Sequence, residues 1–363
     1  MARLGDICAK GSSAVAQKDL ENNDGIYPIY GAGGFIKSVN FYHQEKPYVA
    51  VVKDGAGVGR VMKLPANSSV IGTMQYIIPN EGVNVSYLAY ALEHINLSKY
   101  YLGAAIPHIY FKDYCNEVLP DHTVPEQEHI AATLDMVAEM VSLRKQQLAK
   151  LDELVKARFV ELFGDPETNP NGWEKVTVGD VCSSIVRGPF GSALKKDFFV
   201  EPSDTTYKVY EQKHAIQKSA TIGTYYVTEE KYQELKRFEC VSGDILMSCS
   251  GTMGELYQLP EGCERGIINQ ALCKFTLNDK MLPICFLTYM EQTIGNLETK
   301  GSGIKNIAAV SYVKAMPINL PPMSVQLEFE NFCKQTDKSK LVIQQSLDKL
   351  ETLKKSLMQK YFG

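Results

Sequence analysis

Apolar residues recur at helical spacing in two long stretches, one in the middle of the chain and one at its carboxyl end. The intervals are three, four or seven residues, which fits the 3.5-residue repeat of helices wound around each other. Thr123, Pro125 and Glu126 form a typical helix start, and Arg144 and Arg158 interrupt the apolar series. The apolar positions are Ile130, Leu134, Val137, Val141, Leu148, Leu151, Val155 and Leu162 in the first stretch, and Ile343, Leu347, Leu350, Leu357 and Tyr361 in the second.

The second stretch repeats the first without a gap, at an offset of 199 positions. Gln127 corresponds to Gln326, Leu151 to Leu350, and the Phe163-Gly164 pair to the last two residues of the chain. Matched helices favour a mutual coiled coil. The alternative is a pair of unconnected amphipathic helices, each packed on its own domain.

The segments before each helix are rich in short β-runs separated by Gly, Pro and Asn. Regular alternation of strands and helices is missing, which predicts α+β domains rather than a doubly wound sheet. The predicted strands are Tyr48–Val52, Gln75–Ile78, Thr224–Val227 and Asp244–Met247, and the predicted helices are Ser86–Ile95 and Pro283–Ile294.

These segments also correspond to each other. Leu4–Cys8 matches Val178–Cys182 at an offset of 174, and Tyr48–Gly59 matches Gly243–Gly254 at 195. The growth in offset predicts an insertion of about twenty residues in the second block. The resulting division is a first domain at 1–122, a first helix at 123–163, a second domain at 164–320 and a second helix at 321–363.

The direction of the two helices follows from the length of their connection. A helix of about 37 residues is roughly 55 Å long. Residues 164–172, which link the first helix to Trp173, cover at most about 30 Å. Because this segment is too short to run back along the helix, the sequence predicts antiparallel packing. It also predicts two domains related by a pseudo-two-fold axis.

Composition is typical of a globular protein, with 363 residues of which 45% are apolar and 22% charged. No run approaches the roughly 18 apolar residues of a membrane span, and the first residues show no signal-peptide pattern. The nine cysteines include no C-x-x-C pair, which argues against a disulfide framework or a zinc ribbon. The expected location is the reducing cytoplasm.

The formal net charge of −4 is unusual for a nucleic-acid-binding protein, because contacts to phosphate supply much of the affinity. If this chain binds DNA, either its cations are gathered on one face or partner subunits supply further ones.

No catalytic centre is evident in the sequence. Asp54–Gly59 resembles a nucleotide loop, but Arg60–Pro65 after it has the pattern of a strand where such a loop requires a helix. Asn319–Met323 lacks the aromatic residue of an adenine methyltransferase motif, and no P-loop is present. The six histidines have no metal-ligand spacing. We therefore predict no catalytic residue, no metal ligand and no cofactor in this chain.

Several strings, in their order and spacing, resemble the specificity subunit of type I restriction-modification enzymes, and the resemblance extends over the whole chain. They are Leu154–Asp165, the restart Gly172–Glu174 that leads to Val178–Val181, the ending Leu350–Phe362, and two strings within the domains, Tyr27–Gly34 and Arg187–Lys196.

The resemblance implies two target recognition domains, each reading one half of a bipartite, asymmetric sequence in double-stranded DNA. The coiled coil would set the gap between the halves and dock two modification (methyltransferase) subunits. Those partners would use S-adenosylmethionine to methylate adenine, and motor-nuclease restriction subunits would use ATP and Mg²⁺. The specificity subunit itself is non-catalytic in this family, so the expected role is defence against foreign DNA through partner enzymes.

The candidate DNA-binding residues are polar side chains of the kinds that hydrogen-bond base edges or phosphates. The Arg187–Lys196 segment is the leading candidate, because its glycines allow the backbone to approach phosphate closely. The candidates in the first domain are Tyr30, Lys53, Arg60, Lys63, Thr73, Gln75 and His108. Those in the second domain are Arg187, Ser192, Lys195, Lys196, Lys208, Gln212, Lys213, Ser248, Asn269, Gln270, Lys305 and Asn306.

Two other classes of function remain open at this point. A two-headed protein–protein scaffold fits the duplication and the acidic charge, and differs by lacking sequence-dependent, salt-sensitive DNA binding. A transferase with its own active site would require the isolated chain to bind S-adenosylmethionine.

Overall fold

A computed structural model describes residues 1–55, 57–101, 107–294 and 310–363. The chain forms two compact units, one of residues 1–148 and 342–363, the other of residues 149–341. The candidates Lys305 and Asn306 lie outside the described residues.

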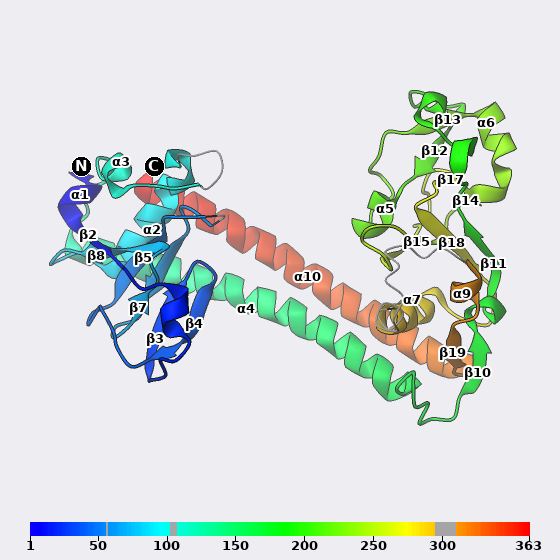
Figure 1. Cartoon of the computed structure of the whole chain (residues 1–363), viewed down its shortest axis with the longest axis horizontal. Coiled ribbons are helices and arrows are strands. Elements are labelled where there is room, and N and C mark those ends of the chain that lie inside the picture. The colour runs from blue at the N-terminus through cyan, green and yellow to red at the C-terminus, as the bar shows by residue number, and fades with distance from the viewer. Residues whose placement is uncertain (56, 102–106, 295–309) are drawn as a thin grey trace. The chain divides into compact units, whose positions relative to one another are not determined.

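The first unit contains a central sheet, a smaller second sheet and a two-stranded ribbon (Figure 1). Its strands are β1 Ala2–Arg3, β2 Cys8–Ser12, β3 Tyr27–Gly31, β4 Gly34–Val39, β5 Tyr48–Val52, β6 Val61–Leu64, β7 Ser69–Val70, β8 Met74–Pro79 and β9 Val118–Leu119. Its helices before the long one are α1 Leu4–Ile7, η1 Gln17–Leu20, α2 Val85–Ile95, η2 Leu97–Tyr100 and α3 Phe111–Tyr114. The central sheet has the order β2-β8-β5-β6 and is antiparallel throughout. The second sheet has the order β4-β3-β7, with β3 parallel to β7.

Strand β5 is the centre of this unit, and all five of its residues are buried. Because successive side chains of a strand point to opposite faces, β5 contributes to two cores. Val49 and Val51 pack in the cluster that contains α2. Tyr48, Ala50 and Val52 pack on the other face with residues such as Val70. The predicted strand at 48–52 is present, and its unbroken apolar run reflects cover on both sides.

The second unit repeats this topology. Its strands are β10 Glu174–Thr177, β11 Cys182–Arg187, β12 Thr206–Tyr210, β13 Tyr226–Thr228, β14 Glu239–Cys240, β15 Ile245–Ser248, β16 Leu256–Gln258, β17 Gly266–Ile268, β18 Leu272–Leu277 and β19 Pro317–Leu320. Its helices before the second long one are η3 Val178–Asp180, η4 Gly191–Ala193, η5 Lys196–Phe198, α5 Gln212–Ile216, α6 Glu229–Glu234, η6 Lys236–Phe238, α7 Pro283–Thr293 and α9 Val310–Lys314. The order β11-β18-β15-β16 matches that of the first central sheet, and β13-β12-β17 matches β4-β3-β7. The prediction of two similar α+β domains is confirmed.

The predicted insertion lies in the connections of the second sheet. In the first unit β3 and β4 form a tight hairpin, whereas α5 lies between β12 and β13. After β13, the second unit adds α6. Its edge strand β14 pairs antiparallel with β17, and the corresponding feature of the first unit is the single antiparallel bridge between Gln44 and Ser68, the residue before β7. The central sheet of the second unit is unchanged by these additions.

Two long helices, α4 Val124–Phe163 and α10 Met323–Phe362, have 40 residues each. The predicted helix start is present, with the backbone N–H and hydroxyl of Thr123 both donating to Glu126 Oε2 at 2.7 Å. Each unit contains a part of each helix, because the division falls after residue 148 in α4 and after residue 341 in α10. The observed boundaries agree closely with the predicted helices at 123–163 and 321–363.

In both units the two helix segments pack against each other in antiparallel directions. In the first unit Lys145 pairs with Glu351 at 2.8 Å, while Leu134, earlier in α4, shares a core with Met358, later in α10. In the second unit Lys340 pairs with Asp152 at 2.6 Å, and Phe163 contacts Phe329. The antiparallel coiled coil is thus confirmed, and the alternative of unconnected helices is wrong.

The repeated glutamines at the helix starts fasten the long helices to their domains. Gln127 accepts from the backbone N–H of Asn84, the residue before α2, at 3.0 Å. Gln326 accepts from the backbone N–H of Leu282, the residue before α7, at 2.8 Å. Both donors belong to helix N-termini, where N–H groups lack partners within the helix. One sequence match therefore corresponds to one repeated structural contact.

Within the part of the chain that the structure describes, no helix has the length and apolarity needed to cross a membrane. All nine cysteines, each in a described segment, are free thiols, and burial raises the pKa of Cys182 and Cys285 to about 12.

Replacing Phe159 with alanine is expected to destabilise the second unit by about 3–5 kcal/mol. Phe159 is fully buried, stacked on Phe163 at 4.2 Å between ring centroids and edge-on to Phe329 at 5.2 Å. Urea unfolding followed by the fluorescence of Trp173, the single tryptophan, reports on this unit. Val160→Ala is the matched control, because Val160 is the next residue and is exposed, and it should change the unfolding free energy by about 0.5 kcal/mol or less. Equal effects of the two variants would contradict the assignment of Phe159 to the helix–helix core.

Candidate nucleic-acid interface

In the first unit, three candidate residues meet where β5 leaves the central sheet. The backbone N–H of Lys53 donates to the carbonyl of Thr73 at 3.0 Å, and that of Ile109 donates to the carbonyl of Lys53 at 3.0 Å. Asp54 accepts a hydrogen bond from His108 Nδ1. Lys53, Thr73 and His108 are therefore brought together by backbone pairing from three separate segments.

Arg60 and Tyr30 lie by the neighbouring hairpin. The exposed Arg60 guanidinium donates to the carbonyl of Ala32, in the turn between β3 and β4, at 2.6 Å. Tyr30 contacts Phe35 edge-on at 6.0 Å between ring centroids, and Phe35 is largely exposed. The hydrogen bond from Arg60 to Ala32 ties the turn after β5 to the β3–β4 hairpin, so the two loops form one surface.

The glycines at 55 and 59 form a turn between antiparallel strands. Gly55 has φ +89° and Gly59 φ +84°, both in the region that favours glycine. A Cβ on Gly59 would lie 2.7 Å from the backbone N of Ser98, so the position also needs the space. The chain continues as β6, which agrees with the strand pattern of Arg60–Pro65 and does not provide the helix N-terminus that a nucleotide loop requires.

One first-domain candidate, Gln75, is corrected by its burial, and another, Lys63, is exposed but engaged in an ion pair within the fold. Gln75 is buried and donates to the hydroxyl of Tyr114. Lys63 Nζ lies 2.8 Å from Ser86 Oγ and 3.1 Å from Asp135, and so joins β6 and α2 to α4. Partial burial acts to raise the pKa of Asp135, but the hydrogen bonds from Tyr90 and Lys63 outweigh it and hold the pKa below its ordinary value.

In the second unit, the segment after β11 is packed against the connection between β17 and β18. Gly188 N–H donates to the carbonyl of Leu272 at 3.0 Å, and Arg187 Nε donates to the carbonyl of Gln270 at 3.4 Å. A Cβ on Gly188 would lie 1.9 Å from the carbonyl oxygen of Asn269, so only glycine fits there. Arg187, Asn269 and Gln270 are thus neighbours. Arg187 itself is buried and forms the base of this surface, which corrects its expected role as an exposed reader.

Helix α5 brings Gln212 and Lys213 to the turn between β15 and β16. Gln212 Nε2 donates to the carbonyls of Ser250 and Thr252, the latter at 3.2 Å. Lys213 pairs with Glu211 at 2.6 Å. Buried His214 fixes the helix: its Nδ1 accepts from Glu211 N–H at 2.8 Å and its Nε2 donates to the carbonyl of Ile222 at 2.7 Å. Burial lowers the pKa of His214, which favours this neutral form.

Two further second-domain candidates are corrected by burial. The side chain of Lys208 is 1% exposed and pairs with Glu264 at 2.7 Å. Ser248 is fully buried, and its hydroxyl accepts from Glu255 N–H at 3.0 Å. Both lie inside strands, β12 and β15. Their polar groups form hydrogen bonds or ion pairs within the domain and are not exposed to contact DNA.

Ser192, Lys195 and Lys196 are exposed on the loop that contains η4 and η5. Within residues 1–55, 57–101, 107–294 and 310–363, neither Lys195 nor Lys196 forms an ion pair. These two lysines therefore remain available for phosphate, and the Arg187–Lys196 segment keeps its place as the leading candidate.

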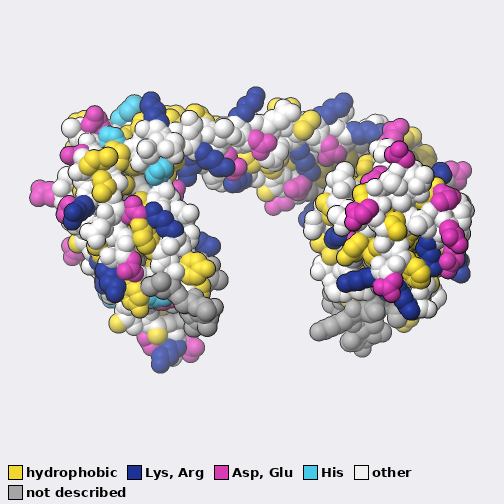
Figure 2. All heavy atoms as spheres, turned by 90° about the horizontal axis from the view of Figure 1, so that it is seen from above, with side chains coloured by type: hydrophobic (Ala, Val, Ile, Leu, Met, Phe, Trp, Pro, Cys, Tyr) yellow, Lys and Arg dark blue, Asp and Glu magenta, His cyan; other side chains and the backbone are white. Residues whose placement is uncertain are grey.

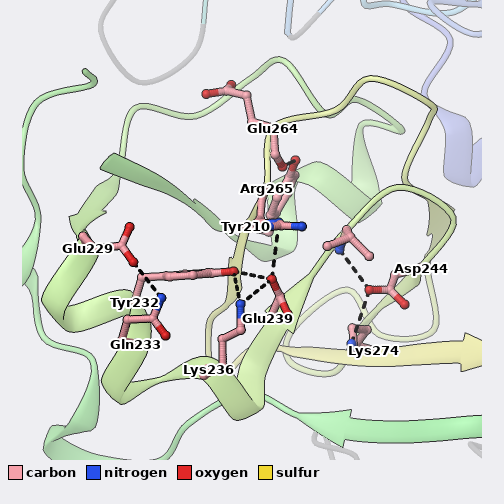
Figure 3. Close-up of polar contacts among 11 residues, drawn as sticks. Tyr210, Glu229, Tyr232, Gln233, Lys236, Glu239, Asp244, Glu264, Arg265 and Lys274 are labelled. Atoms are coloured by element: carbon pink, nitrogen blue, oxygen red, sulfur yellow. Dashed lines mark hydrogen bonds and ion pairs between the residues drawn. The ribbon is translucent and has the colours of Figure 1, made fainter. Parts of the chain in front are cut away.

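Lys236, Arg265 and Lys274, three further cations of the second unit, are paired with carboxylates of the same unit (Figure 3). Lys236 lies 2.9 Å and Arg265 3.4 Å from Glu239, whose carboxylate also accepts from the hydroxyl of Tyr232. Lys274 lies 3.3 Å from the buried Asp244. On the face drawn in Figure 2, Lys and Arg are interspersed with Asp and Glu over the domains and helices. The cations are thus not gathered into a single basic patch on that face.

Two exposed aromatic residues were missed by the choice of polar candidates. Phe190 and Phe35 are both largely exposed. Phe190 lies on the loop that leads to Ser192, Lys195 and Lys196, and Phe35 lies at the start of β4, in the hairpin that contains Tyr30. The Pro189-Phe190 pair lies between two glycines, and this turn pattern is the feature of the sequence that could have indicated an exposed Phe190.

Comparison with known proteins agrees with this geometry. The type I restriction modification DNA specificity domain matches the chain twice, over residues 1–153 and 170–352. The crystal structure of an S subunit of a type I restriction-modification system from M. genitalium is similar at a TM-score of 0.61 with 15% identity, covering 100% of this chain and 95% of that one. A structure reported for the assembly and conformational transition of the type I R-M system is similar at 0.59 with 16% identity, covering 99% and 96%. At these identities the two structures establish the shared fold.

Replacing Glu264 with alanine is expected to destabilise the second unit by about 2 kcal/mol, because it leaves the buried Lys208 ammonium without its carboxylate. Breaking a fully buried ion pair costs about 3–5 kcal/mol. The loss of stability expected here is smaller, because Glu264 is partly exposed to solvent. Urea unfolding measures it, with the nearby exposed Glu261→Ala as control. If Glu264→Ala left the unfolding free energy unchanged and strengthened DNA binding, the freed Lys208 would again be a candidate for contact with phosphate.

Proposed function

Because this chain belongs to the type I restriction-modification DNA specificity family, we propose that it selects a bipartite, asymmetric DNA target, one half through each domain. The observation that carries this proposal is the duplicated domain with unlike loops. The central sheets share one strand order, while the second domain adds α5 and α6 around its own loops. Related scaffolds with different loops are suited to reading two different half-sequences.

In the first domain, the proposed contacts come from Tyr30, Lys53, Arg60, Lys63, Thr73 and His108. In the second, they come from Ser192, Lys195, Lys196, Gln212, Lys213, Asn269 and Gln270, with Lys305 and Asn306 kept as candidates from the sequence alone. Lys195 and Lys196 are assigned to phosphate, since they are exposed and unpaired among the described residues. Asn269 and Gln270 offer amide groups suited to base edges.

The long helices are proposed to set the gap between the half-sequences and to dock two methyltransferase subunits. Exposed apolar residues lie on both helices outside the apolar seam, and some are related by the 199-residue repeat. Leu154 corresponds to Leu353, and Leu143 to Val342. Equivalent apolar positions on two matched helices favour two copies of one partner.

Chemistry is assigned to the partners. S-adenosylmethionine-dependent adenine methylation belongs to the methyltransferase subunits, and ATP-driven, Mg²⁺-dependent translocation and cleavage to the restriction subunits. The chain is proposed to be non-catalytic and to act in the cytoplasm, where its nine free thiols would stay reduced. With a net charge of −4, it relies on its partners for part of the positive surface that DNA requires.

A complex of this chain with its methyltransferase subunits should bind one split DNA sequence with a constant gap. Sequencing of methylated adenine in the host identifies the motif, and a binding assay compares this duplex with a scrambled one at several salt concentrations. Native mass spectrometry should find two methyltransferase subunits per chain. A complex that assembles without any preference for the motif would instead support a two-headed protein scaffold.

The control for this assay is a chimaera in which residues 1–122 come from another family member. Only one half of the methylated motif should change, and the gap should stay constant. If both halves changed together, independent reading by the two domains would be ruled out.

Inserting seven residues after Leu148 and seven after Leu347 should widen the tolerated gap by about three base pairs. The positions correspond in the repeat, and seven residues preserve the spacing of the apolar seam. They add about 10 Å of helix, against about 3.4 Å per base pair. Mapping of adenine methylation measures the gap. The control is a variant without insertions that has seven conservative substitutions around Leu148 and Leu347. A changed half-sequence at an unchanged gap would refute the proposed role of the helices.

A further inference from the structure

Phe190 is an apolar side chain that the fold displays rather than buries. It is 65% exposed, on the loop between β11 and η4. Its neighbours on both sides are fixed in place. Gly188 has no room for a Cβ against Asn269, and Pro189 is buried with a restricted φ. Gly191 has φ +67°, a conformation that favours glycine.

The ring is also supported from below. The Arg187 guanidinium lies 5.3 Å from the centroid of the Phe190 ring. Arg187 is itself buried and donates to the carbonyl of Gln270. The loop is therefore pre-organised, so that insertion of the ring into a partner costs little conformational entropy.

The surroundings of the ring point to DNA as that partner. The exposed Lys195 and Lys196 follow it on the same loop and are available for phosphate, while Asn269 and Gln270 lie at the base of the loop. An apolar ring accompanied by cations and amides matches side chains that enter a base stack while their neighbours hold the backbone. A protein-docking site would instead surround the ring with further free apolar residues. Phe198, on the same loop, is 37% exposed, but the Lys231 ammonium lies over its ring at 4.1 Å from the centroid.

We propose that Phe190 is a wedge that inserts between two adjacent base pairs in the half-sequence read by the second domain. This inference rests on the proposed DNA-binding function. Insertion unstacks the two base pairs and bends the duplex at that step. The second domain would then favour a flexible pyrimidine–purine step at that position, in addition to the bases it contacts directly.

The test uses the full chain assembled with its methyltransferase subunits, and duplexes that carry the motif found by methylation sequencing. 2-Aminopurine placed at successive positions of the half-site read by the second domain should brighten at one step when the complex binds. Phe190→Ala should abolish the brightening and weaken specific binding by about tenfold to a hundredfold. Phe190→Leu should keep both within a few-fold, because leucine also serves as a wedge. The dependence of affinity on salt should stay the same, since no phosphate contact is lost.

Tyr312→Ala is the matched control. Tyr312 is 75% exposed on α9, which packs against η3 and β11 in the same unit, and its loss should leave binding and brightening unchanged. If the wild-type complex selects its motif but Phe190→Ala binds equally well, the wedge is refuted while the proposed function stands. Loss of methyltransferase subunits from the Phe190→Ala complex would show that Phe190 contacts protein, and would refute the wedge as well. If the wild-type complex shows no sequence preference, both proposals fall.

Discussion

The antiparallel contact between α4 and α10 is the interaction on which the rest of the structure depends. Exposure of the apolar seam of either helix to water would be unfavourable, and each helix buries the seam of the other. In the first unit the seam continues into the main core, where Ile130 and Leu134 meet Phe362. In the second unit Phe159 and Phe329 do the same. The helix pair is thus part of both domain cores.

Because the helix pair is part of each core, its position within a domain fixes where that domain's loops lie. Gln127 and Gln326 hold the starts of α2 and α7, and each of these helices belongs to the core beneath its central sheet. The candidate loops follow strands of these central sheets: β5 in the first domain, and β11 and β15 in the second. Backbone hydrogen bonds between these loops then leave few degrees of freedom at the candidate surface. Such pre-organisation suits recognition in which phosphate contacts position the protein and base contacts specify the sequence.

The second domain also shows how charge is divided between fold and surface. Lys208, Lys236 and Lys274 are each paired with a carboxylate of their own domain. Lys195 and Lys196 stay exposed beside an aromatic ring. Counting cations in the sequence therefore overstates the charge that can meet DNA, and an acidic chain can still present a small basic surface.

The family, the two α+β domains and the paired helices could be read from the sequence, because periodicity and internal repetition are local signals that survive divergence. The apolar run at 48–52 and the capping residues beside Thr123 are visible within a few neighbouring residues, and the repeat that contains Gln127 and Gln326 is visible when the chain is aligned with itself. The antiparallel direction followed from the length of one connection.

The tertiary structure alone decided which polar residues reach the surface. Lys208, Ser248 and Gln75 have the chemistry of DNA readers, yet the strand pairing and the partners Glu264, Glu255 and Tyr114 place them in the interior. Phe190 has the chemistry of a core residue, yet the glycines beside it and Arg187 beneath it keep it in solvent. Residue type sets what a side chain can bind, but exposure depends on contacts between segments distant in sequence, which no local pattern encodes.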